Sequence, residues 1–277
     1  MRSAASRTRS TASCRALTNR TNMCGRFVAH SPSDQIAAYF GADLPVETLG
    51  ENYNVTPTQD IYGVVAPRGG NAQSAPQLEA FHWGLIPNWA KDRKIGSRMT
   101  NARSETLAEK PAFKGLFPKK RLLIPMDGFY EWKIGAAGGP LTVKGKPAKQ
   151  PYFVHRSDGK PLAAAGLWSA WQDRNQSIDN DAAPVWLHSA TVITTRANTT
   201  MAPVHDRMPV LVPQTRWAEW LDPTNHDIEA LSSLFDMSAD CTLEIRPVST
   251  DVNSARNNYP ELINETDPLS RPPTALF

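Results

Sequence analysis

The chain of 277 residues is poor in cysteine and has no long apolar segment. Its 3 cysteines, Cys14, Cys24 and Cys241, are too few and too widely spaced for a disulfide framework, and none forms a CxxC pair. We therefore expect no structural zinc site, and a reducing, cytoplasmic compartment. No stretch approaches the roughly 20 apolar residues that a membrane-spanning helix needs. We expect no metal, cofactor or membrane as a partner.

Acidic residues are absent from residues 1–22, which carry five arginines. Without these arginines the chain has 25 Lys and Arg against 27 Asp and Glu, so the formal net charge of +3 becomes −2. Because the rest of the chain is not generally basic, binding of nucleic acid would require a local cluster of arginines. The segment also lacks the apolar core of a secretory signal. Three interpretations are open: a transit-like peptide, a disordered basic tail, or translated sequence upstream of a true start at Met23.

The regular alternation of strands and helices typical of α/β proteins is missing as well. Short β-branched or aromatic runs between Gly and Pro predict strands at 24–29, 61–67, 78–84, 121–126, 129–133, 151–155, 162–171 and 187–195. We expect Ser31 to be the N-cap of a helix, with Pro32 at its first position and Gly41 at its end. Further helices are predicted at 104–109, 214–221 and 227–235, the last capped by Thr224 or Asn225.

These elements predict an α+β fold, a single domain built on a mixed, barrel-like β-sheet with a few short helices. The domain is expected over 23–263, preceded by the 1–22 leader. Loops or hairpin tips are expected at 135–149 and 172–184. The proline-containing tail 264–277 is expected to be disordered.

Seven small polar clusters stand out in this frame: MCGRF (23–27), YNVTPT (53–58), WGLIPNW (83–89), TNARSET (100–106), DGFYEWK (127–133), PVHDRMP (203–209) and RPVSTDVN (246–253). Each is weak by itself, since a lone cysteine is usually a small buried hydrophobe. A lone glutamate between aromatics is more often a strand residue that faces solvent. Only the set, in its order, carries a functional interpretation.

Taken together, the clusters resemble the SRAP family, the abasic-site processing proteins. The resemblance runs from Cys24 to about Ile263 and depends on MCGRF, NARxET, DGxxEWK and HDRxP. In that family the initiator Met is removed and Cys becomes the first residue, so we expect translation to start at Met23. The resemblance implies a protein, expected to be monomeric and nucleoid-associated, that cross-links covalently to abasic sites in single-stranded DNA.

An N-terminal cysteine suits this chemistry because it presents an amine and a thiol two carbons apart. The amine condenses with an aldehyde to an imine, and the thiol then closes a thiazolidine ring. The pKa of an α-amine is about 7.7–8.0, against about 10.4 for lysine. At pH 7.5 roughly a third of the α-amine is therefore neutral, against about a tenth of a percent of a lysine.

The resemblance assigns roles to further residues. Glu131 corresponds to the acid/base glutamate, and its aromatic neighbours are expected to raise its pKa. His205 corresponds to the histidine that helps to open the sugar ring, and Asn101 to the asparagine that holds Cys24 and the lesion. Seven residues are expected to contact DNA: Arg26, Arg103 and Arg207 at phosphates, Asn54, Pro57 and Thr194 along the strand, and Trp89 on a base.

One position departs from the family pattern, because Ala90 stands where a second aromatic often follows the tryptophan, so the DNA wedge is expected to be weaker. Four other tryptophans are expected in the core: Trp132, Trp168, Trp171 and Trp186. Five histidines have no ligand spacing and are assigned no role: His30, His82, His155, His188 and His226. Cys241 is expected to be buried.

Two other functions are open. Cys24 with His205 and Glu131 could form a cysteine peptidase or an N-terminal nucleophile hydrolase that releases its own leader. Alternatively, the arginines and the tryptophan could bind single-stranded DNA without any covalent step. Exchange of Cys24 for Ala separates these functions, because only the cross-linking enzyme then loses a covalent product.

Overall fold

The centre of the fold is a closed barrel of five strands. The computed structural model describes residues 25–67, 74–134, 142, 145, 148–172, 185–236 and 242–268. The barrel strands are β3 (Asp60–Val65), β4 (Gln77–Trp83), β6 (Arg121–Met126), β9 (Leu162–Gln172) and β10 (Trp186–Arg196). They pair in the order β10-β4-β3-β6-β9, and pairing of β9 with β10 closes the ring. The β4–β10 pair is parallel and the other four are antiparallel, so the prediction of a mixed, barrel-like sheet is confirmed.

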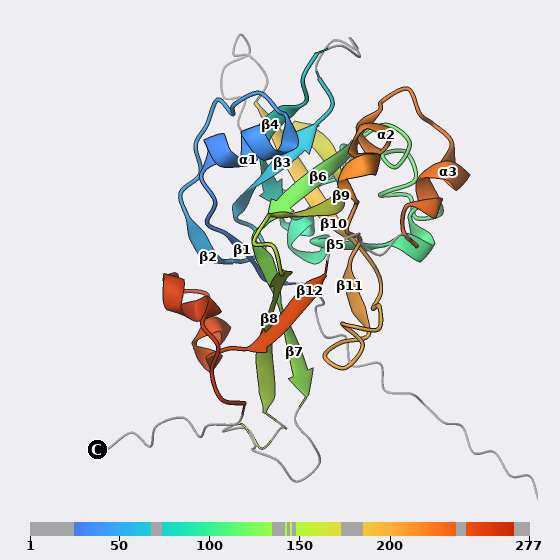
Figure 1. Cartoon of the computed structure of the whole chain (residues 1–277). Helices are drawn as coiled ribbons and strands as arrows, with labels where there is room; N and C mark the ends of the chain where they lie inside the picture. Colours follow the sequence, from blue (N-terminus) through green and yellow to red (C-terminus); the bar gives the residue numbers. More distant parts are fainter. Residues whose placement is uncertain are drawn as a thin grey trace, which may run out of the picture.

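A second sheet of five antiparallel strands adjoins the barrel. Its order is β12 (Leu243–Pro247), β8 (Lys149–Arg156), β7 (Gly128–Ile134), β1 (Phe27–Ala29) and β2 (Asn52–Val55). Figure 1 shows β7, β8 and β12 extending below the barrel. Two short strands, β5 (Asn101–Arg103) and β11 (Arg207–Pro209), pair with the end of β10. The sequence did not predict β2, β5, β11 or β12 as strands.

The first helix, α1 (Ser33–Phe40), ends as predicted at Gly41, which adopts a left-handed conformation with φ +62°. Its predicted N-cap is wrong, because Pro32 occupies that position. The Ser31 hydroxyl instead donates to the carboxylate of Asp127, which also accepts the backbone N–H of Ser31 at 2.9 Å. The hydroxyl therefore ties the start of the helix to the second sheet.

The remaining helices are short: the 3₁₀ helices η1 (Arg93–Arg98), η2 (Ser104–Thr106), η3 (Gln214–Arg216), η4 (Thr250–Asn253) and η5 (Pro260–Ile263), and the α-helices α2 (Trp217–Leu221) and α3 (Ile228–Ser233). The helix predicted at 214–221 is confirmed as η3 and α2, whereas 104–109 contains only the turn η2. The predicted caps of α3 are wrong. Asp227 is its N-cap, with a carboxylate that accepts the backbone N–H groups of Glu229 and Ala230 at 3.0 Å.

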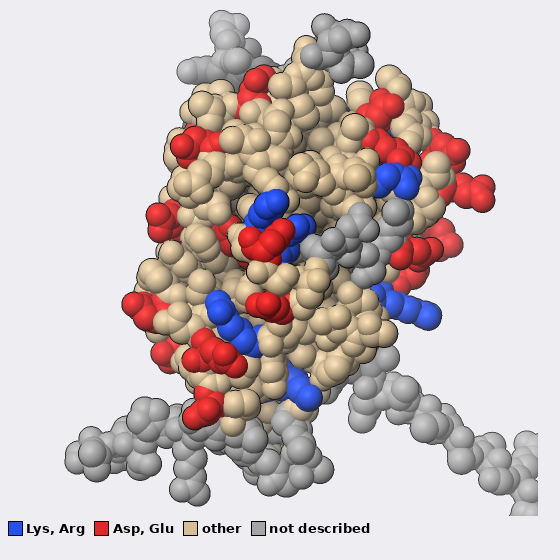
Figure 2. Space-filling view, viewed as in Figure 1, with Lys and Arg blue, Asp and Glu red and all other residues tan. Residues whose placement is uncertain are grey.

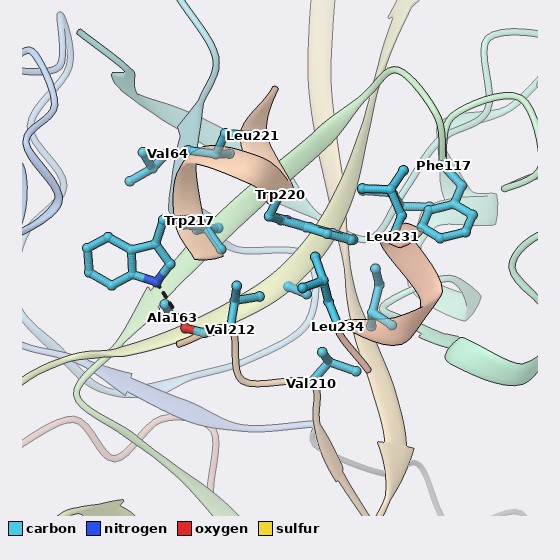
Figure 3. Packing of buried hydrophobic residues seen from close by; sticks show 14 of the residues in the cluster. Val64, Phe117, Ala163, Val210, Val212, Trp217, Trp220, Leu221, Leu231 and Leu234 are labelled. Atoms are coloured by element: carbon cyan, nitrogen blue, oxygen red, sulfur yellow. Dashed lines mark hydrogen bonds between the residues drawn. The ribbon is translucent and has the colours of Figure 1, made fainter. Parts of the chain in front are cut away.

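Alternate residues of the barrel strands divide between two apolar clusters, as a period of two requires. Ile61 and Val65 belong to a cluster that fills the barrel and continues into the second sheet. Tyr62 and Val64 belong to the other cluster, which the helices cover from outside. Figure 3 shows this outer cluster, in which Trp220 lies between the barrel and α3. Because both clusters share the barrel strands, the described residues form one domain.

Polar groups at the edge of the outer cluster are satisfied by backbone carbonyls. Trp217 Nε1 donates to Val212 O at 2.9 Å (Figure 3). Arg121 is only 4% exposed, and its Nε donates to Trp220 O at 2.6 Å. Burial lowers the pKa of Arg121 to about 10, so the guanidinium is still charged at neutral pH. Arg121, the first residue of β6, therefore connects this strand to α2.

Outcomes for the tryptophans are mixed. Trp171 is buried as expected and Trp132 and Trp168 are half-buried, whereas Trp186 is 55% exposed, so its assignment to the core is wrong. At the start of the predicted tail, the N–H of Thr266 donates to Pro247 O at 2.9 Å. The sequence 269–277, the leader 1–22, Cys241, 173–184 and most of 135–149 lie outside the described residues. In the described part of the chain, no helix is both long and apolar enough to span a membrane.

The outer cluster should dominate the stability of the fold. Leu231 on α3 is fully buried, so Leu231→Ala should lower the free energy of unfolding by about 2–5 kcal/mol through lost burial and a residual cavity. Leu44, which is 65% exposed, provides a control, and Leu44→Ala should change the free energy of unfolding by less than about 0.5 kcal/mol. Denaturant titrations of both variants measure the difference. Equal losses would contradict this packing.

Candidate active site

Two of the polar clusters lie on opposite edges of β10. In β5, Asn101 pairs in parallel with Val192, and Arg103 pairs with Thr194. On the opposite edge, Arg207 of β11 pairs with Arg196. The TNARSET and PVHDRMP segments, about 100 residues apart in the chain, therefore lie next to the same end of one barrel strand.

Two further clusters meet where β1 pairs with β7. Phe27 stands opposite Phe129, and the N–H of Tyr130 donates to Arg26 O at 3.0 Å. Continued by two residues, this register sets Gly25 opposite Glu131. Cys24, which precedes Gly25 in the sequence, lies outside the described residues.

Trp83, at the end of β4, connects these two regions. Its side chain is fully buried and packs edge-on against the ring of Phe27, with the centroids 5.1 Å apart. Its Nε1 donates to Thr100 O at 3.0 Å, immediately before Asn101. Its own carbonyl accepts the N–H of Thr58 at 2.8 Å. One side chain and its peptide groups thus fix the starts of β1 and β5 and the turn at Pro57.

Glu131 is a buried carboxyl group, only 2% exposed. Alternate residues of a strand share a face, so Glu131 lies on the same face of β7 as Phe129, whose ring belongs to the barrel-filling cluster. The carboxyl group therefore faces the barrel side of the second sheet, at the height of Gly25. Water has little access to this position.

His205 is held in one orientation by its neighbours in the chain. The backbone N–H of Arg207 points at His205 Nδ1 at 3.1 Å, so this nitrogen is an acceptor and the ring proton is on Nε2. The Asp206 carboxylate is 3.1 Å from the same nitrogen but is 86% exposed, so water screens its charge. The side chain of His205 is 13% exposed. It can therefore offer an Nε2–H donor at the protein surface.

Arg26 and Asn54, both expected at the DNA, contact each other and the C-terminal segment, with Arg26 partly buried and Asn54 buried. Arg26 Nη1 donates to Asn54 Oδ1 at 2.9 Å and to Val252 O. Asn54 is only 2% exposed, and its amide donates to Ser254 O and Asn257 O, each at 2.9 Å. Partial burial lowers the pKa of Arg26. The two residues therefore hold the C-terminal segment around η4 against β1 and β2.

This contact also gives the RPVSTDVN cluster a role that the sequence did not reveal. The cluster forms the end of β12 and η4, and its Asn253 accepts the indole N–H of Trp132 at 2.7 Å. Through Arg26 and Trp132 the cluster supports β1 and β7 from the face opposite Glu131. The only signal in the sequence was a polar cluster without an obvious partner.

Thr194 and Arg207 are also internal. Thr194 is fully buried, and its carbonyl accepts Arg207 Nη2 at 2.6 Å. Arg207 is only 7% exposed and forms a bidentate ion pair with Glu105. Burial alone would raise the pKa of Glu105, but hydrogen bonds from Arg207 and from the backbone outweigh it and lower that pKa. The carboxylate is therefore ionised at neutral pH.

Three of the expected DNA contacts remain accessible: Arg103, Trp89 and Pro57. Arg103 is exposed at the end of β5, and Trp89 is 60% exposed in the loop after β4. That loop is clamped at its base, because a Cβ on Gly84 would lie 2.6 Å from Gly96 O. Figure 2 shows acidic and basic groups interspersed over one face of the molecule, in keeping with DNA binding that depends on local contacts.

Comparisons with known proteins agree with the resemblance. The family model for SOS response associated peptidases (SRAP) matches residues 23–255. Abasic site processing protein YoqW of Bacillus subtilis (strain 168) is 41% identical over 243 residues, which cover 87% of this chain and 99% of that protein. Abasic site processing protein HMCES of Xenopus tropicalis is 31% identical over 210 residues, covering 66% of this chain and 56% of that protein.

A crystal structure of a protein from Bacteroides thetaiotaomicron has the same fold. It superposes with a TM-score of 0.71 and covers 88% of this chain and 100% of that one, at 22% identity. The family model alone covers well over half of the chain, and the ordered set of clusters lies within it. The chain belongs to the SRAP family of SOS response associated peptidases.

Proposed function

We propose that this protein processes abasic sites in single-stranded DNA by forming a covalent adduct through Cys24 as its N-terminal residue. Its relatives are named abasic site processing proteins. The observation that carries the proposal is the pairing of β1 with β7, whose register, continued by two residues, sets the buried Glu131 opposite Gly25. Glu131 is thus a proton-transfer group to which water has little access. It lies beside Gly25, the residue that follows Cys24 in the chain.

The reaction begins with the closed sugar of the abasic site. As the C1′–O4′ bond breaks, the C1′ hydroxyl gives up its proton to water and becomes an aldehyde. The ring oxygen, which accepts a hydrogen bond from the Nε2–H group of His205, takes a proton from water and becomes the C4′ hydroxyl group. The neutral α-amine of Cys24 adds to the aldehyde, and loss of water leaves an imine. Glu131 transfers the protons that this dehydration requires.

Ring closure completes the adduct. The thiol sulfur of Cys24 adds to the imine carbon, and its proton passes to the nitrogen, so that aldehyde and aminothiol become thiazolidine and water. The imine that would lead to strand cleavage is consumed. The expected product is therefore a stable cross-link that shields the lesion, formed by an enzyme of lyase type.

Recognition of the strand is assigned to the accessible residues. Arg103 contacts a phosphate, Trp89 stacks on a base, and Pro57 wedges the strand beside the lesion. Asn101 holds Cys24 and the lesion by hydrogen bonds. Arg26, Asn54 and Thr194 contribute by supporting the surfaces around them. The protein is proposed to act as a cytoplasmic, nucleoid-associated monomer.

The family description favours a second candidate activity, because it names a peptidase. The thiol of Cys24 would add to the carbonyl carbon of the peptide bond that precedes it, and the amide nitrogen would leave as the α-amine. Water would then hydrolyse the resulting thioester and release residues 1–23, with His205 and Glu131 as proton-transfer groups. The activity would expose the α-amine that the cross-linking reaction requires.

The mature N-terminus is the first prediction of the proposal. We expect the purified active protein to begin at Cys24, and its intact mass to correspond to residues 24–277. An intact mass that retains residues 1–22, together with full cross-linking activity, would contradict a terminal amine as the nucleophile. Retention of the leader in Cys24→Ala but not in the parent would support self-release.

The second prediction separates the covalent residue from the proton-transfer residues. Cys24→Ala should abolish the stable adduct, because no thiol remains to close the ring. Glu131→Gln and His205→Ala should slow adduct formation by about 10²–10⁴-fold each yet leave the same product. A time course with an abasic single-stranded oligonucleotide on a denaturing gel measures all three.

Either of two results would overturn these assignments. A heat-stable adduct with Cys24→Ala removes the central claim. Wild-type rates with both Glu131→Gln and His205→Ala show that the proton-transfer roles are wrong, even if Cys24 is the nucleophile. Affinity without any adduct in the parent protein would indicate a non-covalent binding module.

The third prediction concerns the phosphate contact. Binding to single strands that carry a tetrahydrofuran analogue of the abasic site, which has no aldehyde, should weaken with salt. Arg103→Ala should flatten the log–log salt dependence by about 0.7, the value for one phosphate contact on a single strand. Arg216, paired with Glu219 beside α2, is the control, and Arg216→Ala should leave the slope unchanged. An unaltered slope in Arg103→Ala rejects the contact.

A further inference from the structure

The parallel strands β4 and β10 separate toward the end of the barrel at which both of them begin. Their ladder has two residue pairs, at His82 and Trp83 of β4. Nearer to the start of β4, Asp43 takes the place of β10 by pairing in parallel with Gln77. Residues of both strands and of the segment after α1 border a cavity of about 440 Å³. The seam between the two strands is therefore hollowed.

The backbone of β4 faces this cavity at Ala80. The N–H of Leu78 donates to Asp43 O at 3.2 Å, and the N–H of Gly84 donates to Ala190 O at 2.9 Å. Alternate residues of a strand direct their N–H and C=O groups to the same side. Ala80, which lines the cavity between these two contacts, therefore directs its backbone groups into the opening. Such an edge suits an extended segment, which adds to a sheet through main-chain hydrogen bonds.

The cavity has an apolar rim. The part of the chain that the structure describes has six large apolar side chains that are exposed, and three of them line this cavity: Leu44, Val46 and Trp186. A fourth, Val185, directly precedes Trp186. Apolar residues scattered singly over a surface are ordinary, whereas a group of them around one cavity indicates an interaction site.

Acidic side chains accompany the apolar rim. Asp43, Glu47, Asp60 and Glu79 line the cavity, and none of its described lining residues is Lys or Arg. Glu79 lies 3.6 Å from Nδ1 of His188, whereas the other three acids are exposed. This field repels the phosphates of DNA and attracts a positively charged partner. A symmetric dimer through the same surface would bring the acids of both copies together.

We infer that this cavity is a docking site for an extended segment of another protein, in which apolar side chains alternate with lysine or arginine. The apolar side chains of the segment cover the rim, its backbone pairs with Ala80, and its cations face Asp43 and Glu47. The inference goes beyond the proposed function, because it concerns a protein partner and does not depend on the chemistry of Cys24.

The apolar rim and the candidate active site lie at different ends of β10. The strand begins at Trp186, and Thr194, which pairs with Arg103, follows eight residues later. At about 3.3 Å per residue, the two positions are roughly 25 Å apart along the strand. Substitutions at the rim therefore leave the groups that act on DNA in place.

Selection of short random peptides displayed on phage, with the parent protein as the target, tests the partner chemistry. We expect the enriched sequences to combine apolar residues with Lys or Arg. A synthetic peptide of the enriched sequence should bind with a Kd that rises with salt, because salt screens the exposed acids. Failure to enrich any sequence, or enrichment of sequences without basic residues, would overturn the inference.

Substitutions at the rim test the location with the same synthetic peptide. Trp186→Ala should weaken binding at least about tenfold, because large aromatic side chains dominate the affinity of many interfaces. The double variant Asp43→Asn, Glu47→Gln should weaken binding several-fold and flatten its salt dependence. Ile134→Ala and Glu229→Gln, at exposed positions of β7 and α3, are the matched controls and should bind as the parent does. Unchanged binding in the rim variants rejects this location.

Two rival occupants are distinguished by further measurements. In sedimentation velocity the parent should not form a dimer that Trp186→Ala dissociates, and such a dimer would assign the cavity to a second copy. A synthetic peptide of residues 1–22 should bind more weakly than the selected peptide, because Met1 and Leu17 are its only large apolar residues. Tighter binding of that peptide would assign the cavity to the leader and overturn the inference.

Failure of the inference can be told from failure of the proposed function. The rim variants should form the DNA adduct at the rate of the parent, so a loss of peptide binding in them does not come from unfolding. If the parent forms no adduct, the proposed function is wrong, and thermal unfolding of each variant then provides the same control. If the adduct forms but the rim variants bind the peptide as the parent does, only the docking site is wrong.

Discussion

The rest of the site depends on the contacts that Trp83 makes at the end of the barrel. A closed five-strand barrel leaves an interior that side chains must fill, and here the filling continues out of one end into the second sheet. Trp83 stands at this end with its ring against Phe27 and its indole N–H on Thr100 O. It thereby couples the strand that follows Cys24 to the strand that starts with Asn101, although 77 residues separate them in the sequence.

Polar groups around the site serve mainly to hold segments together. Arg26 with Asn54, and Arg207 with Glu105, each join elements that are distant in the chain. A buried charge that loses its partner costs several kcal/mol, so such pairs are sensitive points even where their net contribution to stability is small. In the part of the chain that the structure describes, the site therefore has few free cations, and its affinity for DNA would depend on geometry more than on net charge. This agrees with a chain that is slightly acidic outside its leader.

The sequence was informative where a segment carried its own pattern. The barrel strands contain β-branched or aromatic runs bounded by Gly and Pro, and Gly41 and the 214–221 segment have local signals, so all were predicted. β5 and β11 are three residues long and polar, and they become strands only because β10 offers free edges to them. The hydrogen-bond partners of Ser31 and Asp227 were not predictable either. A hydroxyl or a carboxylate can bond to several groups, and only the fold determines which of them lie near.

The same limit applies to the site. Resemblance could nominate Arg26, Arg103 and Arg207 as equivalent cations, because all three have the same side chain in polar clusters. Their burial separates them: one is exposed and two are engaged with Asn54 and Glu105. The sequence could not give this distinction, because burial depends on the packing of η4 and η2 against the sheets.

The contact between Gly84 and Gly96 has a consequence for how the family can diversify. Each glycine lies against the carbonyl oxygen of the other, at a distance that a methyl group would not allow. The two ends of the loop are therefore fixed, whereas Asn88 to Lys94, which include Trp89, are largely exposed. The exposed tip of this loop can therefore be exchanged without disturbing the barrel. One such exchange is the tip of a relative that has a second aromatic residue at the position of Ala90.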